Sequence, residues 1–390
     1  MSSISSLSAA VIGTGFIGGV HLQSLRRIGV RISGILGSSP ARAGAKAAEW
    51  GIDHVYSDLN ELLDDPAVDV VHITSPNDEH FAQARAALLA GKHVVCEKPL
   101  AMDSRQTREL SHLAAASRRV AAVNYNIRFY PQVREMRARI ADGRVGQPHL
   151  ITGSYLQDWL LYESDWNWRV DSARGGPLRA VGDIGSHWFD VVAFVSGAAI
   201  ESVFADLSTF VPSRRRPVGP IETFSNSGHT VTEAHEVDTE DAANVLLHFA
   251  GGARGAVTVS QVSAGRKNRI ALEISAAAAS LSWNGERPDE LWIGHRDRPN
   301  ELLMRDPALL SEDASAVVAV PGGHAEGFEN TFAAMYREVY TDVLHGGPSA
   351  RPNYATFADG HQENLILDAI AESARTGQWT SVVAADTEGE

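Results

Sequence analysis

The sequence predicts an α/β protein of two domains, in which a domain with a parallel sheet precedes an α+β domain with an antiparallel sheet. A chain of 390 residues exceeds the size at which a single hydrophobic core keeps growing. Through residue 125, short apolar runs alternate with segments of helical spacing, which is typical of a parallel sheet. Later apolar runs mostly follow one another without helices, which favours antiparallel pairing. We therefore expect domains at residues 1–125 and 126–390.

The first domain begins with an apolar run at residues 9–12 that leads into the glycine-rich segment 13–19. Apolar residues then recur at roughly helical spacing up to Ile28, and an apolar stretch at 30–36 completes a strand, helix, strand unit. The alternation continues from there. The further elements expected are helices at 42–50, 79–90 and 104–117 and strands at 68–74, 92–96 and 120–125.

The second domain combines apolar runs typical of strands with segments of helical spacing, and we expect an α+β arrangement. Its strands are expected at 150–157, 203–211, 244–249, 256–262 and 270–274, and its helices at 132–141, 186–196, 326–344 and 356–373.

Composition excludes several classes of partner. The formal net charge of −14 would repel a phosphate polymer, so no nucleic-acid partner is expected, and the basic run 214–216 is predicted to be a solvated loop. Cys96 is the only cysteine, which leaves no cysteine cluster for zinc, and we expect no metal. The first residues lack a secretory signal and no long apolar run occurs, which predicts a cytoplasmic protein without a membrane partner.

Gly13, Gly15 and Gly18 form the pattern G-x-G-x-x-G between the first strand and the first helix. A turn without side chains lets backbone amides approach a pyrophosphate, and the helix N-terminus adds positive potential. The pattern therefore indicates dinucleotide binding, with Phe16 and Ile17 at the start of the helix among the binding residues. The alternative is a tight turn between strand and helix.

The end of the second strand distinguishes NAD from NADP, because a carboxylate there binds the ribose 2′-OH and repels a 2′-phosphate. This chain has Gly37, Ser38 and Ser39 at that place, with Arg42 just beyond. Small hydroxyl residues and an arginine can receive a phosphate, which favours NADP. The serines with Pro40 also form a signal for the start of a helix, and both interpretations can hold.

Four further candidates for cofactor contacts follow the strand at 68–74, namely Ser75, Pro76, Asn77 and His80. They lie at the carboxyl edge of the sheet, where open α/β sheets bind ligands. For His80, a position on the helix surface is the favoured alternative.

Glu97, Lys98 and Pro99 end the next strand at the same edge. An ammonium at that place can stabilise an alkoxide or polarise a carbonyl during hydride transfer. Taken alone, the tripeptide could equally be a strand end followed by a turn.

Asp183 and His187 stand four residues apart at the start of an apolar helix. This spacing puts both side chains on one helix face, so the carboxylate could orient the imidazole, which suits proton exchange with an alcohol. The alternative is a capping aspartate and an unrelated histidine.

Together, the glycine-rich turn, the segment 96–99 and the pair Asp183 and His187 resemble the Gfo/Idh/MocA oxidoreductase family over essentially the whole chain. The resemblance implies an N-terminal Rossmann fold and a C-terminal α+β domain with an open, mostly antiparallel sheet. The exposed face of that sheet often makes the oligomer contact, so a homodimer or homotetramer is expected. By position, Lys98 would be the catalytic lysine, Asp183 its acidic companion and His187 the acid/base, with Glu97 on the nicotinamide side of the cofactor.

Within the family, the segments 155–159, 166–169 and 264–268 most resemble members that act on sugars and anhydrosugars. Aromatic rings can stack on the C–H faces of a pyranose while polar side chains bind its hydroxyls, although the tryptophans could equally be core or interface. The candidate substrate-binding residues are Lys98, Tyr125, Arg128, Tyr155, Trp168, Arg169, Asp183 and His187.

The implied activity is NAD(P)-dependent oxidation of a hydroxyl of a sugar, anhydrosugar or polyol. Two alternatives stay open: an enzyme that cleaves glycosides through transient oxidation by a tightly held NAD, and a non-catalytic regulator that senses the cofactor. Lys98 and His187 are both present, which favours a catalyst.

Overall fold

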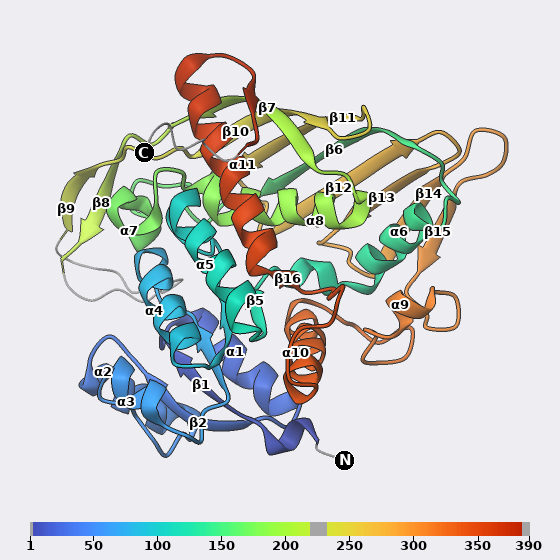
Figure 1. The fold of residues 1–390 in the computed structure, drawn as a ribbon. Coiled ribbons are helices and arrows are strands. Elements are labelled where there is room, and N and C mark those ends of the chain that lie inside the picture. The colour runs from blue at the N-terminus through green and yellow to red at the C-terminus, as the bar shows by residue number, and fades with distance from the viewer. Residues whose placement is uncertain (1–2, 219–231, 384–390) are drawn as a thin grey trace. The chain divides into compact units, whose positions relative to one another are not determined.

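The computed structural model describes residues 3–218 and 232–383, which form two compact units (Figure 1). The first unit contains residues 3–126 and 328–364, and the second contains the other described residues. The predicted division into 1–125 and 126–390 assigned residues 328–364 to the second domain, whereas the structure places them in the first unit. No local pattern in that segment marks where it packs.

The first unit is built on a six-stranded sheet with the strand order β16-β5-β4-β3-β1-β2. All neighbours pair in parallel except β16 at the edge. Four of the strands consist entirely of buried residues, as expected for parallel strands covered on both faces. The predicted parallel domain is confirmed. Its strands are β1 (Ser8–Ile12), β2 (Arg31–Leu36), β3 (Val70–Ile73), β4 (His93–Cys96), β5 (Ala121–Val123) and β16 (Ala355–Thr356).

The helices of the first unit include three that begin at a capping side chain. Ser39, Asp58 and Asp103 each accept a hydrogen bond from a backbone N–H of the first turn. The sequence did not predict α3, which is too short to show helical periodicity. Figure 1 shows α10 packed beside α1. The helices are η1 (Ile4–Ser6), α1 (Phe16–Arg27), α2 (Pro40–Trp50), α3 (Leu59–Asp64), α4 (Asn77–Leu89), α5 (Ser104–Ser117) and α10 (Phe328–Leu344).

The second unit is built on a nine-stranded sheet with the order β15-β14-β13-β12-β6-β11-β10-β7-β17. Only the pair β6 and β11 is parallel among its described strands, which confirms a mostly antiparallel sheet. Along β10, buried positions alternate with exposed ones, so one face is covered and the other is open. The strands are β6 (Pro148–Leu156), β7 (Ile200–Ser208), β10 (Ala242–Phe249), β11 (Arg254–Ser260), β12 (Arg269–Ala276), β13 (Ser280–Asn284), β14 (Glu290–Gly294), β15 (Glu301–Met304) and β17 (Thr380–Ser381).

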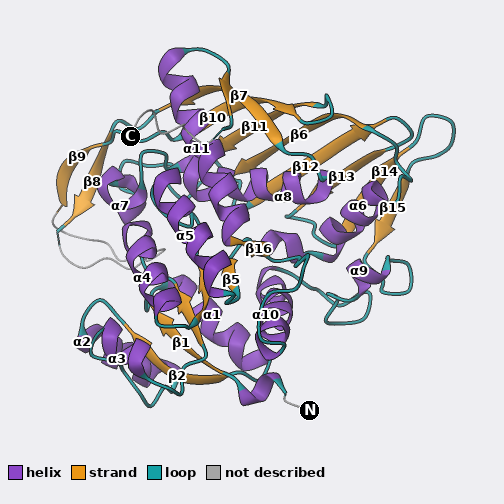
Figure 2. Cartoon of the chain, in the orientation of Figure 1, coloured by secondary structure: helices purple, strands orange, loops and turns teal. Residues whose placement is uncertain are grey.

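Helices α6 and α8 cover one face of this sheet (Figure 2). The buried Trp188 donates from its indole nitrogen to the Ala271 carbonyl at 3.0 Å. A Cβ on Gly153 would overlap both groups, so a glycine is needed where α8 approaches the sheet. The helices are η2 (Asn126–Phe129), α6 (Pro131–Ala141), η3 (Trp168–Val170), α7 (Ser172–Gly175), the π-helical turn η4 (Val181–Gly185), α8 (Ser186–Ser196), α9 (Glu312–Ser315) and α11 (Phe357–Thr376), which begins in the first unit.

The basic run 214–216 lies in β8 (Ser213–Pro217), which pairs with β9 (Thr232–Glu236). Arg214 is 1% exposed and donates to Asp241 at 2.8 Å and to the Leu160 carbonyl. The predicted solvated loop is therefore wrong for Arg214, because a buried carboxylate attracts its guanidinium. In the part of the chain that the structure describes, no helix is long and apolar enough to cross a membrane.

Candidate active site

The glycine-rich turn joins β1 to α1 in the first unit. Gly13 has a φ of 99°, and a Cβ there would lie 2.6 Å from the Thr74 carbonyl. A Cβ on Gly18 would overlap the Gly13 carbonyl, whereas a Cβ on Gly15 would meet nothing within 4 Å. The turn is thus tightly packed at Gly13 and Gly18 and open at Gly15, where the exposed Phe16 begins the helix. This geometry fits a pyrophosphate at the helix N-terminus.

The segment after β2 carries no carboxylate side chain. A Cβ on Gly37 would lie only 2.9 Å from that of Ala43, so a larger residue does not fit without a shift. Ser39 caps α2 by accepting the Arg42 N–H at 3.4 Å, which supports the helix-start interpretation for this serine. The side chains of Ser38 and Arg42 are exposed.

His80 is 1% exposed, so its expected position on the helix surface is wrong. Its Nδ1 lies 2.8 Å from the Pro99 carbonyl oxygen, and its Nε2 lies 2.9 Å from that of Ser75. The imidazole therefore links the end of β3 to the end of β4 rather than reaching outward to a cofactor. The Ser75 hydroxyl is likewise used inside the protein, because it donates to Gln83 at 2.7 Å. Pro76 and the buried Asn77 follow at the start of α4.

Glu97 follows β4 and is 7% exposed. Its Oε1 accepts hydrogen bonds from His21 at 3.1 Å and from the Asn124 amide at 2.5 Å, and its Oε2 accepts the Lys98 backbone N–H at 3.3 Å. Lys98 itself is partly exposed. The preceding Cys96 is fully buried, which raises the pKa of its thiol well above the usual range and makes it an unsuitable nucleophile. The carboxylate thus fixes the backbone from which Lys98 projects.

Asp183 lies in η4 of the second unit, and each of its carboxylate oxygens accepts a hydrogen bond from a side chain of the same unit. Nε of Arg169 donates to Oδ1 at 3.1 Å, and the amide of Gln261 donates to Oδ2 at 2.8 Å. The Arg169 guanidinium also stacks on Trp168, at 4.3 Å from the ring centroid, and donates to Asn167. The structure therefore brings three of the predicted residues, Trp168, Arg169 and Asp183, into one cluster.

His187 lies in the first turn of α8 and is 8% exposed. Its ring centroid is 6.2 Å from that of Tyr155, another predicted residue. The Tyr155 hydroxyl donates to Oδ1 of Asn268 at 2.8 Å, and the same oxygen accepts from the amide of Gln157. Burial raises the pKa of Tyr155 above its usual range, and the charge of Asp183 adds to this, so the phenol stays neutral.

Arg128 does not fit its predicted role in substrate binding. It is 5% exposed, and its guanidinium donates to both oxygens of the buried Asp190 at 2.6–3.1 Å. Its charge is used in this pair and over the ring of Phe194. Tyr125, in the first unit, is 1% exposed and belongs to the hydrophobic core there.

Two residues that were not predicted from the sequence hold the predicted ones. His21 comes three residues after Gly18 and binds Glu97. Gln261 follows strand β11 and binds Asp183. A polar residue at the end of an apolar strand was the available signal for Gln261, and the sequence places no comparable signal at His21.

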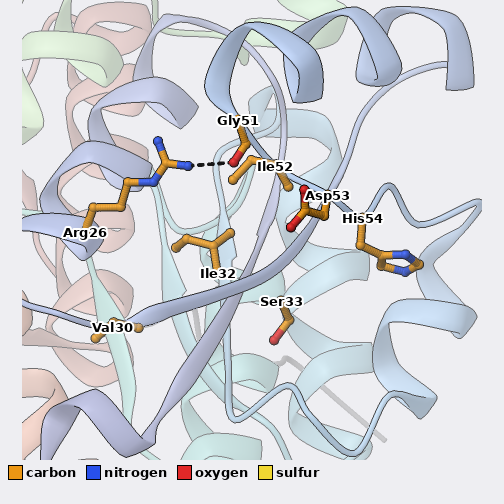
Figure 3. Close-up of a pocket in the computed structure, with 8 residues that line it drawn as sticks. All are labelled: Arg26, Val30, Ile32, Ser33, Gly51, Ile52, Asp53 and His54. Atoms are coloured by element: carbon orange, nitrogen blue, oxygen red, sulfur yellow. Dashed lines mark hydrogen bonds between the residues drawn. The ribbon is translucent and has the colours of Figure 1, made fainter.

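A separate surface pocket of about 350 Å³ lies beside the first residues of β2 (Figure 3). Arg26 spans it by donating to the Gly51 carbonyl at 3.0 Å, and Ser33, Asp53 and His54 lie around it. The glycine-rich turn follows the carboxyl end of β1, whereas this pocket lies at the opposite ends of the strands. It is therefore not the dinucleotide site.

Two family profiles match the chain. The profile described as "Oxidoreductase family, NAD-binding Rossmann fold" matches residues 7–125, and that of the "GFO/IDH/MocA C-terminal domain" matches residues 133–282. The first match contains the glycine-rich turn and Lys98, and the second contains Asp183 and His187.

Similar proteins include levoglucosan dehydrogenase of Pseudarthrobacter phenanthrenivorans, which is 30% identical over 96% of this chain and 98% of its own length. Myo-inositol 2-dehydrogenase of Thermotoga maritima is 27% identical over 64% of this chain and 67% of its own length. Among solved structures, levoglucosan dehydrogenase with NADH and levoglucosan has a TM-score of 0.85, at 29% identity over 97% of this chain and 99% of that one. An inositol dehydrogenase homologue from Azotobacter vinelandii with NAD+ has a TM-score of 0.83, at 26% identity over 96% and 97% of the two chains.

Proposed function

Because the chain belongs to the Gfo/Idh/MocA oxidoreductase family, we propose that it is a dehydrogenase that oxidises a hydroxyl group of a sugar, anhydrosugar or polyol. The observation that carries the proposal is the placement of Lys98 in the first unit. Lys98 follows the carboxyl end of β4, and the glycine-rich turn follows the carboxyl end of β1 in the same parallel sheet. The lysine and a dinucleotide on the turn therefore share one sheet edge.

The proposed chemistry divides between three side chains. His187 accepts the proton of the substrate hydroxyl, and Asp183, oriented by Arg169 and Gln261, keeps a negative charge near the imidazole that becomes positive. The Lys98 ammonium stabilises the negative oxygen while the carbon loses its hydride and the carbonyl forms. The oxidised nicotinamide, when bound, supplies the acceptor for the hydride.

The substrate class follows from the cluster around Asp183. Trp168 offers an aromatic face and Arg169 offers further donors beside it, a combination that suits the C–H faces and hydroxyls of a pyranose. The names of the relatives support the same class, since they include levoglucosan, inositol and D-glucoside dehydrogenases.

For the cofactor, we propose that NADP is preferred over NAD. Support comes from Ser38 and Arg42, which are exposed after β2, and from Gly37, where a carboxylate does not fit. The two solved structures described above hold NADH or NAD+, so NAD is the cofactor against which this preference is tested.

For assembly, we propose a homodimer or homotetramer formed through the open face of the nine-stranded sheet. Strand register places Leu246, Leu150, Trp292 and Leu302 on this same face, and all four are exposed. Light scattering coupled to size exclusion tests this, and a monomer would contradict it.

The proposed activity is tested with a panel of aldoses, inositols and anhydrosugars, each with NAD and with NADP. Net formation of the reduced cofactor is expected with at least one sugar, whereas cleavage of a glycoside without net reduction would indicate transient oxidation. Lys98→Ala should bind the dinucleotide like the unaltered enzyme but lose turnover. Full activity in that variant would overturn the proposal.

A further inference from the structure

Gln261 is completely buried and holds one oxygen of Asp183. Its amide nitrogen donates to Oδ2 at 2.8 Å, while Arg169 donates to Oδ1 at 3.1 Å. With a donor on each oxygen, the carboxylate is favoured in its ionised form and cannot rotate about its last bond without breaking both contacts.

The main chain of Gln261 is fixed by a group of buried charges. Its N–H donates to the Asp241 carbonyl at 3.0 Å, and its own carbonyl accepts the Leu160 N–H at 3.2 Å. The Asp241 side chain is fully buried and forms ion pairs with Arg179 and Arg214. The position of the amide therefore depends on a charge cluster that has no exposed member.

The main chain of Asp183 is fixed by the same cluster. Its N–H donates to the Arg179 carbonyl at 2.8 Å. The buried Glu240 accepts the N–H groups of Arg179 at 3.0 Å and Val181 at 2.8 Å. The charge cluster thus fixes the main chains of both Gln261 and Asp183. The fold therefore determines the 2.8 Å contact between their side chains.

The amide oxygen of Gln261 shows that the residue contributes to the site through its amide nitrogen. Its Oε1 is buried, and within the described residues it has no hydrogen-bond partner. Burying an acceptor without a partner costs free energy that an apolar side chain of the same shape would avoid. The hydrogen bond that the amide nitrogen donates to Asp183 offsets this cost.

We propose that Gln261 is a positioning residue that keeps Asp183 ionised and oriented for proton transfer at His187. This inference rests on the proposed function, in which Asp183 assists His187. An amide suits the task because it donates to the carboxylate and does not titrate.

Several charged or titratable groups surround the pair. Arg169 faces Asp183 from η3, His187 lies on α8 and Tyr155 on β6, while Arg179, Glu240 and Asp241 lie along the main-chain contacts. Tyr155 stays neutral because burial raises the pKa of its phenol. Burial also raises the pKa of Glu240, against the backbone donors that bind it. Because several titratable groups lie near the pair, the effect of altering Gln261 on the pH profile is compared with the effect of altering a second buried glutamine.

Gln132 provides that matched control. It is also completely buried in the second unit, its amide nitrogen donates to the carbonyls of Asp289 and Leu303, and its Oε1 has no partner among the described residues. Gln132→Glu introduces the same buried carboxylate as Gln261→Glu, but not against Asp183.

The test measures kcat and KM against pH for Gln261→Glu and Gln132→Glu, with NAD or NADP and the sugar that the panel turns over fastest. Two carboxylates in contact share a proton, so Gln261→Glu should move the acid side of the profile upward by about one pH unit or more. It should also lower kcat about tenfold or more at neutral pH without raising the dinucleotide KM. Gln132→Glu should keep the original profile. An unchanged profile in Gln261→Glu, or an equal shift in both variants, would overturn the inference.

A measurement without substrate covers the case in which Gln261→Glu is unstable. Adding Asp183→Asn to Gln261→Glu restores an amide and a carboxylate in exchanged positions, so the thermal midpoint should recover, whereas Gln132→Glu should gain nothing from Asp183→Asn. Lack of recovery would contradict the contact. If Asp183→Asn alone keeps full activity, the proposed function fails; if it is inactive while Gln261→Glu behaves normally, only the role of Gln261 fails.

Discussion

Nε2 of His21 lies 3.1 Å from Oε1 of Glu97, so a buried histidine holds the carboxylate that precedes Lys98. A carboxylate only accepts hydrogen bonds, so this nitrogen carries the proton. Nδ1 of the same ring lies 3.0 Å from Nδ1 of His72, whose Nε2 lies 3.0 Å from the Tyr340 hydroxyl. Burial holds the pKa of His72 well below its usual range, so this ring is neutral and offers one donor and one acceptor. The contacts form one buried series that runs from Glu97 through His21 and His72 to Tyr340.

Replacing Tyr340 by Phe removes the hydroxyl that ends this series. The Nε2 of His72 would then be a buried polar atom without its partner, which should lower the free energy of unfolding by about 1–2 kcal/mol. Urea unfolding measures the difference. Tyr162→Phe is the control, because Tyr162 is 65% exposed and should change stability by less than about 0.5 kcal/mol. Equal effects in the two variants would mean that the hydrogen bond between Tyr340 and His72 does not stabilise the fold.

His93 should make the protein less stable in acid. Burial, helped by the nearby Arg119, lowers its pKa to about 4, and its Nδ1 accepts the Val120 N–H at 2.9 Å. Unfolded histidine titrates near about 6.5, so between these values the unfolded state binds more protons and stability falls as pH falls. The loss attributable to His93 is at most about 3 kcal/mol, complete near pH 4 and absent above about pH 7.

The pH dependence is checked by urea unfolding of His93→Asn at several pH values. Asn can still accept the Val120 N–H but does not titrate, so its stability should vary less with pH than that of the unaltered protein. The exposed His149 gives the control variant His149→Asn, which should keep the full dependence. A His93→Asn protein with an unchanged acid slope would refute this assignment.

Arg128 provides a test that separates stability from substrate binding. Arg128→Leu leaves the buried Asp190 without its cation and should lower stability by about 3–5 kcal/mol. The double variant Arg128→Leu with Asp190→Leu removes both charges and should recover most of that loss. Thermal unfolding measures stability, and the sugar KM of the double variant should equal that of the unaltered enzyme. A raised KM with normal stability would restore the role in substrate binding.

The sequence predicted elements whose signal is local. The buried strands β1, β3 and β4 are mostly apolar, and the glycine-rich turn falls between β1 and α1 as expected. The short elements were missed because β13, β14 and α3 contain too few residues to establish a period.

The residues that sequence reasoning misplaced are those whose partners leave no signal in the local sequence. Arg128 pairs with Asp190 and Arg214 pairs with Asp241, and no sequence pattern around either arginine predicts its carboxylate partner. His80 shows the same limit, because its two partners are backbone carbonyls, which every sequence contains. Lys98, Asp183 and His187 could be singled out because each stands at the end of an element that the sequence does predict.

Arg42 should decide how well the protein uses NADP. If its exposed guanidinium binds the 2′-phosphate, Arg42→Ala should raise the KM for NADP about tenfold or more, the equivalent of one charged hydrogen bond. The KM for NAD should stay within about twofold, because NAD has an uncharged hydroxyl at that place instead of a phosphate. Lys46→Ala is the control, since Lys46 lies on the same helix and pairs with Glu49. Equal changes for both cofactors in Arg42→Ala would contradict phosphate binding.

Gly13 and Gly15 should respond differently to the same substitution. Alanine at Gly13 must adopt a φ of 99° and place its Cβ 2.6 Å from the Thr74 carbonyl, so Gly13→Ala should lower stability by about 2–4 kcal/mol. Nothing lies within 4 Å of a Cβ on Gly15, so Gly15→Ala should change the free energy of unfolding by less than about 0.5 kcal/mol. That methyl group would instead occupy the open side of the turn, where the pyrophosphate is expected. Gly15→Ala should therefore weaken dinucleotide binding about tenfold or more in a calorimetric titration, the equivalent of about 1.4 kcal/mol. Unchanged affinity in this stable variant would place the dinucleotide elsewhere.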